Sequence, residues 1–300
     1  MENVPLHNIE TLRMVGFWPG EEKLDVARWL NNFEPADTEI AKILLRSFIF
    51  LSDRVVDTLM ADAYVALLGS FANGYESSDC AANAREPRLL FTFPTGEKPH
   101  CTDSGFSFAR KVRQLFDIDE EFIKFPHDAV KSIAESRRGD NVDTVLVLVD
   151  DFAGTGQQLS KTLCRKVDLE EEELSIDDLA RCYNVDVHYC VLAATSRAKN
   201  LFERKYEYLH LHCPHILGKK YGVHSENTAM IPSAKRDAVL DLITKYSDRY
   251  MRAEAVPDYV GTYGFNELGL TIAFQHSVPD ATLPIFWSCT ADWNPLYRRS

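Results

Sequence analysis

The chain has 300 residues, of which 45% are apolar and 26% are charged, a composition that excludes disordered and collagen-like proteins. Its 45 acidic and 33 basic side chains give a net charge of -12, which disfavours a free-standing nucleic-acid binder. Because the sequence shows no signal-peptide pattern, no apolar run of the roughly 18 residues that a membrane span needs and no CxxC pair among its seven cysteines, we expect a cytoplasmic protein with reduced thiols and no membrane contact.

The first part of the chain has a helical pattern. Apolar residues recur at three- and four-residue steps over residues 21–68, and Pro35 interrupts them, which predicts two or three helices. The polar stretch at 73–88 is typical of a connection or an active-site loop. We therefore expect residues 1–80 to form a helical extension ahead of a main domain at 81–300.

Strands and helices alternate in the main domain. In chain order, the pattern predicts a strand at 89–93, a helix at 106–116, a strand at 143–149, a helix at 157–167 and a strand at 185–194. These strands are apolar on both faces, as a parallel sheet covered by helices requires. The predicted fold class is therefore α/β, with a Rossmann-like parallel sheet flanked by helices and preceded by the N-terminal helical extension.

The remaining segments are less regular. Seven of the eleven residues at 168–178 are acidic and none is basic, which favours a solvated surface excursion over a metal site. Further along, we expect a helix at 233–252 and strands at 268–274 and 283–287.

The run from Val145 to Leu159 carries the clearest chemical pattern. A buried strand leads into Asp150 and Asp151, and a loop with two glycines and Thr155 then opens a helix. In α/β sheets this edge binds ligands, and the N–H groups that begin a helix attract phosphate. Two carboxylates beside a phosphate need hydroxyl donors or a cation, and a ribose 5-phosphate meets both requirements. The alternative for the two acids is a simple helix-capping turn.

Residues 146–158 resemble the signature of type I phosphoribosyltransferases, namely four apolar residues, two acids and a small-residue loop with Thr-Gly. The resemblance implies that Asp150 and Asp151 are the catalytic acids and hold the ribose hydroxyls. It also implies a loop that wraps the 5-phosphate of phosphoribosyl pyrophosphate, formed by Ala153, Gly154, Thr155, Gly156 and Gln157. Purine salvage members carry an acid at the position of Gly154, where it is proposed to handle a proton of the nucleobase. This chain lacks that acid, so the loop does not indicate the chemistry at the nucleobase.

A second resemblance extends over most of the chain. Its motifs are Trp29-Leu30-Asn31-Asn32-Phe33, Leu44-Leu45-Arg46, the Asp-Asp-Phe run, and the two tail segments at 282–287 and 293–298. These are similar to the PRTase-CE-like proteins of bacterial conflict and defence systems, some of which accompany retron reverse transcriptases. The resemblance implies a phosphoribosyltransferase-type fold in an anti-phage effector, with a phosphorylated ribose or nucleotide as ligand and with a reverse transcriptase and its nucleic acid as partners if the protein is retron-associated. We also expect that the chain could form a homo-oligomer.

An active enzyme of this kind needs a second anion site for the leaving pyrophosphate, which magnesium, backbone amides or basic side chains would match. In such a fold this site is the loop after the first core strand, and its candidates are Lys98, Ser104, Gly105 and Arg110. Arg137 and Arg138 lie just before the signature strand and are further candidates. Magnesium is expected only with a pyrophosphate-bearing ligand, and no protein-held metal is predicted.

Two questions of chemistry stay open at this point. Transfer at ribose C1 by a glycosyltransferase and cleavage by a nucleotide N-glycosidase would use the same pocket, and a catalytically inactive module that senses nucleotides or binds a partner would keep the fold without the reaction. A second open question is the crowding of histidines and a cysteine between residues 210 and 224, which invites zinc but lacks a familiar four-ligand spacing. Its members are His210, His212, Cys213, His215 and His224.

Overall fold

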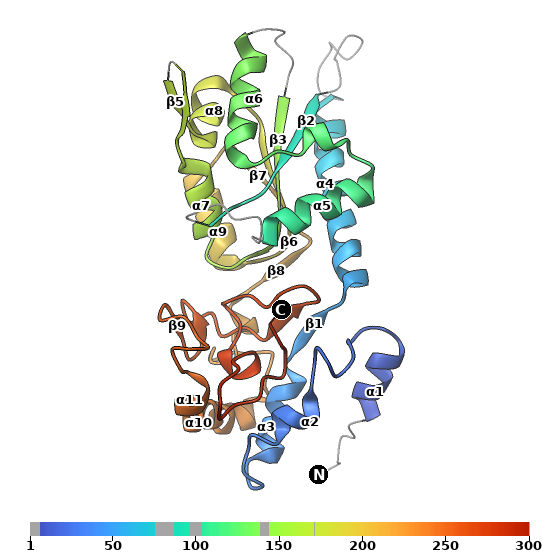
Figure 1. The fold of residues 1–300 in the computed structure, drawn as a ribbon, viewed down its shortest axis with the longest axis vertical. Helices are drawn as coiled ribbons and strands as arrows, with labels where there is room; N and C mark the ends of the chain where they lie inside the picture. Colours follow the sequence, from blue (N-terminus) through green and yellow to red (C-terminus); the bar gives the residue numbers. More distant parts are fainter. Residues whose placement is uncertain (1–6, 76–86, 97–103, 139–143, 171, 300) are drawn as a thin grey trace. The chain divides into compact units, whose positions relative to one another are not determined.

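The computed structural model describes residues 7–75, 87–96, 104–138, 144–170 and 172–299. The chain packs as two compact units, one formed by residues 1–56 together with 218–300 and the other by residues 57–217 (Figure 1). This division differs from the boundary near residue 80 that the sequence suggests, because the N-terminal segment packs with the C-terminal one. Each unit is described by itself below.

The unit at 57–217 is built on a parallel sheet. Its strands follow the order β2-β3-β6-β7, and β8 pairs with β6 beyond the end of β7. The strands are β2 (Arg88–Thr92), β3 (Thr144–Ala153), β6 (Val187–Thr195), β7 (Leu209–His212) and β8 (His215–Leu217). Each of the pairings in this sheet is parallel, which confirms the predicted α/β class.

Helices cover both faces of this sheet (Figure 1). On one face, Tyr64 of α4 contacts Phe91 of β2 and stacks on Phe116 of α5. On the other face, four helices share a buried apolar cluster with Leu148 and Val191. The helices are α4 (Asp53–Tyr75), α5 (Ser104–Phe116), α6 (Pro126–Arg138), α7 (Gln157–Cys164), α8 (Ile176–Tyr183) and α9 (Ser196–Lys205), with a short 3-10 turn at η2 (Glu120–Phe122).

Strand β3 is longer than its sequence pattern indicates. The apolar run predicts an end at Val149, but Phe152 and Ala153 still pair with Ala193 and Ala194 of β6. The strand continues because its neighbour β6 is buried along its whole length and pairs with it as far as Ala194. Both aspartates of the signature therefore lie within the strand and not in the loop that follows it.

The acidic stretch at 168–178 also has more structure than expected. It contains the antiparallel pair β4 (Val167–Leu169) and β5 (Glu172–Leu174) and the first turn of α8. The Ser175 hydroxyl accepts the backbone N–H of Asp178, whose carboxylate accepts the N–H of Ser175 in return. Some of the acidic side chains thus serve as a helix cap.

The other unit combines the two ends of the chain. Strand β1 (Ile49–Leu51) pairs in parallel with β11 (Ile272–Phe274), and β9 (Val260–Gly261) pairs with β10 (Gly264–Phe265). Its helices are α1 (His7–Met14), α2 (Val26–Leu30), α3 (Thr38–Arg46), α10 (Arg236–Lys245) and α11 (Ser247–Tyr250), with 3-10 turns η3 (Lys219–Tyr221), η4 (Ser233–Lys235) and η5 (Pro284–Phe286).

An aromatic core holds this unit together. The Trp29 indole N–H donates to the carbonyl oxygen of Ile285 at 2.8 Å, and its ring stacks on Phe286 with centroids 5.5 Å apart. Phe33 contacts both Trp29 and Trp293 edge-on. The strand predicted at 283–287 is wrong, because the segment turns into η5 at Pro284, which has no N–H for a strand ladder.

Candidate functional site

The loop between β3 and α7 is fixed at the carboxyl edge of the sheet. The Thr195 hydroxyl of β6 donates to the carbonyl oxygen of Gly154, and the Thr155 hydroxyl accepts the N–H of Gln157 at 3.4 Å. Gly156 is the N-cap residue of α7 and has a φ of 77°. Of the residues that the resemblance assigns to phosphate, Ala153 ends the strand, 154–156 form the turn, and Gln157 begins the helix and is exposed.

Gly156 is required here for two reasons. Its positive φ disfavours residues with a side chain, and an added Cβ would lie 2.7 Å from Cε1 of Phe202 and 3.0 Å from Cδ2 of Leu201 on α9. Helix α9 leaves no room for a side chain at Gly156. Residue 156 is therefore bare backbone, and it leads directly into the free N–H groups at the start of α7. This is the local geometry that a phosphate site uses.

The two acids are nearly inaccessible. Asp150 is 3% exposed and Asp151 is 6% exposed. The Tyr189 hydroxyl donates to Oδ2 of Asp150 at 2.9 Å, and the backbone N–H of Asp151 donates to its Oδ1 at 3.0 Å. Burial, and next to it the charge of Asp151, raise the pKa of Asp150 well above its ordinary value, while the Tyr189 hydrogen bond opposes the shift. Asp150 therefore keeps its proton to higher pH than an ordinary aspartate does.

Tyr189 is a site residue that the sequence analysis missed. It lies inside a strand that was correctly predicted, but its role depends on register. Leu148 pairs with Tyr189, so both side chains share the sheet face onto which Asp150 also projects. Burial raises the pKa of Tyr189 well above its ordinary value, with Asp150 as the next cause, so Tyr189 stays a neutral donor. A polar hydroxyl within an apolar strand was the one available signal.

The residues proposed for pyrophosphate have different positions. Ser104 begins α5, and Gly105 packs so closely on the residues that follow β2 that an added Cβ would lie 2.8 Å from Cβ of Phe93. Arg110 is exposed on α5. Lys98 lies outside the described residues. The first turn of α5 is thus held against the segment that leaves β2, whereas Arg110 lies on the exposed surface of the helix.

Neither arginine before β3 is brought to the loop by a described contact. The guanidinium of Arg137 lies over the ring of Tyr183 on α8, 5.4 Å from its centroid. Arg138 is the last residue of α6. The prediction that these two residues reach the site therefore gains no support from the described contacts.

The comparison with known families now decides what the chain is. The family model PRTase-CE matches residues 26–299. The chain belongs to the PRTase-CE family. A search of curated proteins finds no match. The match confirms the predicted family, and the central parallel sheet agrees with a phosphoribosyltransferase-type fold. Since the match runs through both units, the PRTase-CE pattern includes the aromatic core around Trp29 as well as the sheet.

One membrane-related prediction can be compared with the described part of this PRTase-CE protein. Within residues 7–75, 87–96, 104–138, 144–170 and 172–299, no helix has both the length and the apolar character that crossing a bilayer requires.

Three histidines of the PRTase-CE chain, His188, His210 and His212, form a stack. Nδ1 of His188 lies 2.8 Å from Nε2 of His212, and the His188 ring also stacks on His210 with centroids 4.8 Å apart. His224 belongs to the other unit, where it contacts Tyr263. Among the described residues, no group of three or more His, Cys, Asp or Glu side chains could hold a metal ion. The structure therefore gives no support to the zinc interpretation.

This stack makes the fold sensitive to acid. Burial, and next to it the charges of His210 and His212, lower the pKa of His188 from 6.5 to about 3. Between these two pH values the unfolded chain binds more protons than the folded one, so the free energy of unfolding should fall as the pH is lowered through this window. Urea titrations from pH 7 to pH 4 should show a shallower fall for His188→Gln than for wild type. The exposed His127→Gln is the control, and equal slopes for wild type and His188→Gln would contradict the assignment.

Proposed function

We propose that this PRTase-CE protein binds a phosphorylated ribose at the β3–α7 loop and exchanges or cleaves the bond at ribose C1. The observation that carries the proposal is the juxtaposition of a tightly held glycine turn, Gly154 to Gly156, with a buried carboxyl pair directly before it. The turn supplies N–H donors for a 5-phosphate, and the pair supplies oxygen atoms for two neighbouring hydroxyls. A ribose phosphate presents both kinds of group.

The protonation of the pair suits this role. Two ionised carboxylates beside a phosphate would repel it, whereas a neutral Asp150 removes one of the charges and can donate to a ribose oxygen. Tyr189 fixes the orientation of the Asp150 carboxyl group through its hydrogen bond. The reaction would then depend on holding the sugar phosphate in place and stabilising the leaving group, without a protein nucleophile. Either transfer to an acceptor or hydrolysis of a nucleotide fits this scheme.

Magnesium would enter the site with a pyrophosphate-bearing ligand. Asp150 and Asp151 are the hard oxygen donors that Mg²⁺ prefers, but Mg²⁺ usually takes only one or two carboxylates and fills the rest of its shell with water and phosphate oxygens. When bound, the ion would neutralise charge on the departing pyrophosphate.

A biological role in anti-phage defence is the second part of the proposal, and it rests on the resemblance of the Trp29-Leu30-Asn31-Asn32-Phe33 motif and the tail segments to proteins of bacterial defence systems. In a retron-type assembly the chain would contact a reverse transcriptase and its nucleic acid. The net charge of -12 favours a protein-mediated contact over direct binding to phosphates. The alternative is a module that senses nucleotides without turning them over, and the observation that favours it is the glycine at position 154, where purine salvage members carry an acid.

Calorimetric titration of the full chain with phosphoribosyl pyrophosphate and Mg²⁺ tests the proposal. We expect binding by the wild type and a loss of about 100-fold in affinity for Asp151→Asn, because a buried charge-assisted contact to a hydroxyl is removed. The matched control is Asp168→Asn, which changes an exposed aspartate on β4. It should bind phosphoribosyl pyrophosphate as the wild type does. Absence of binding by the wild type would overturn the proposal. Release of pyrophosphate on addition of bases would identify an enzyme, and tight binding without release would identify a sensor.

A further inference from the structure

Residues 93–96, the segment after β2, are hydrogen-bonded to α7, the helix that follows the loop proposed to bind phosphate. The backbone N–H of Thr95 donates to the Thr162 hydroxyl oxygen of α7 at 3.0 Å, and that hydroxyl lies 3.3 Å from the carbonyl oxygen of Thr95. Thr95 is 0% exposed and Thr162 is 1% exposed. The hydrogen bond is thus shielded from water, which makes its loss costly.

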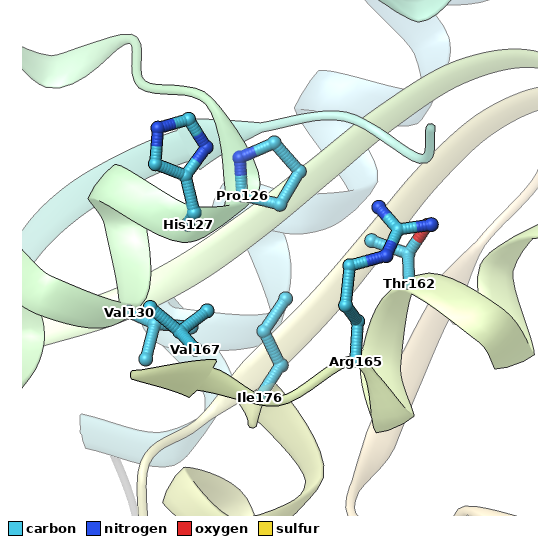
Figure 2. Close-up of a pocket in the computed structure, with 7 residues that line it drawn as sticks. All are labelled: Pro126, His127, Val130, Thr162, Arg165, Val167 and Ile176. Atoms are coloured by element: carbon cyan, nitrogen blue, oxygen red, sulfur yellow. The ribbon is translucent and has the colours of Figure 1, made fainter. Parts of the chain in front are cut away.

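A second side chain from the same helix end reinforces this connection. The guanidinium of Arg165 donates from Nη1 to the Thr95 hydroxyl and from Nη2 to the carbonyl oxygen of Gly96. Figure 2 shows the Arg165 side chain extended alongside Thr162, with its guanidinium group turned toward that residue. Both of these partners of the guanidinium are neutral oxygen atoms of the segment after β2.

These contacts relate to the two ends of the proposed ligand. Helix α7 begins at Gln157, directly after the turn proposed to hold the 5-phosphate. Thr95 and Gly96 follow β2 at the sheet edge against which the first turn of α5 also packs. A helix of this length moves as a rigid body, so the position of its first turn and the position of Thr95 are linked through Thr162 and Arg165.

We propose that Thr162 and Arg165 are positioning residues that couple the phosphate turn to the segment after β2, and thereby set the geometry for the pyrophosphate end of the ligand. This inference rests on the proposed function and adds to it two residues that touch neither end of the ligand themselves. Arg165 also brings a positive charge to this segment of an acidic chain.

Titrations with two ligands test this coupling. Ribose 5-phosphate carries only the phosphate and sugar, whereas phosphoribosyl pyrophosphate with Mg²⁺ also requires the segment after β2. We expect Thr162→Val and Arg165→Met to bind ribose 5-phosphate within about twofold of wild type and phosphoribosyl pyrophosphate about tenfold more weakly, the loss of one buried hydrogen bond. Thr162→Ser keeps the hydroxyl and should restore wild-type binding of both ligands.

The outcomes separate this inference from the proposed function. Equal weakening of both ligands, or no weakening of either, would overturn the coupling while leaving the site in place. A wild-type protein that binds neither ligand would overturn the proposed function and the coupling with it. Should Thr162→Val unfold, as a melting curve would show, Arg165→Lys supplies the same comparison, because it keeps the charge and loses one of the two donors.

Discussion

Replacing Asp150 by Asn is expected to raise the free energy of unfolding at neutral pH and, at the same time, to weaken the binding of a sugar phosphate. In the folded chain the pKa of the Asp150 carboxyl lies well above its ordinary value, chiefly because of burial and then because of Asp151. A carboxyl group with a raised pKa stabilises the fold below its unfolded value of 3.8, and this contribution is lost as the pH rises through the folded pKa. An asparagine side chain does not ionise, so the Asp150→Asn variant does not lose this stability as the pH rises.

The substitution is also compatible with the local hydrogen bonds. An amide oxygen can accept the N–H of Asp151, and the amide nitrogen can donate to the hydroxyl oxygen of Tyr189. Because the folded-state pKa is raised, the gain in unfolding free energy should appear above the ordinary carboxyl pKa and grow as the pH rises. Urea unfolding between pH 5 and pH 8 should show that Asp150→Asn gains on wild type as the pH rises.

Asp168→Asn, on the exposed side of β4, provides the baseline for that experiment. A stability of Asp150→Asn that is equal to or below that of wild type at every pH would contradict the assignment of the proton to Asp150. A gain in stability together with a loss of ligand affinity is the signature of a functional residue, because ionisable groups that destabilise a fold are kept at sites where they act on a ligand.

Replacing Gly156 by Val should have the opposite effect on the fold. The added side chain would meet Cε1 of Phe202 at 2.7 Å, and Phe202 is itself buried and cannot move aside. The positive φ of 77° adds about 1–2 kcal/mol of backbone strain to about 1–3 kcal/mol of overpacking. We expect a loss of about 2–5 kcal/mol in unfolding free energy and no measurable binding of ribose 5-phosphate.

Gly16 offers a matched control for the strain alone. It has a similar φ of 75°, but nothing lies within 4 Å of an added Cβ. Gly16→Val should therefore cost only the backbone strain. If the two variants lost the same stability, packing of Phe202 on the turn would not be the cause of the requirement for glycine.

The sequence predicted the sheet well where each strand is apolar on both faces. Strands β2, β3 and β6 were predicted, because continuous apolar runs are a local signal. The end of β3 was not predicted, because Phe152 and Ala153 stay in the strand only through pairing with β6. Helices α6, α8 and α9 were not predicted, and α8 was hidden because it begins inside the acidic stretch at 168–178.

For the candidate site, sequence reasoning found the loop but not its surroundings. Asp150, Asp151 and the glycine turn stand together in the chain, so a motif could identify them. Tyr189, Thr162 and Arg165 act through partners that are far away in sequence, and strand register and the path of the segment after β2 determine those contacts. Contacts of this kind are tertiary, and no periodicity predicts them.

The unit that joins residues 1–56 to residues 218–300 has a consequence for how the protein is made. Trp29 finds its carbonyl partner in Ile285, and β1 finds its neighbour in β11, more than two hundred positions later. A ribosome delivers the sheet of residues 57–217 well before either partner emerges, and that unit can assemble first. The early helices must then wait, with their aromatic side chains exposed, until translation is almost complete.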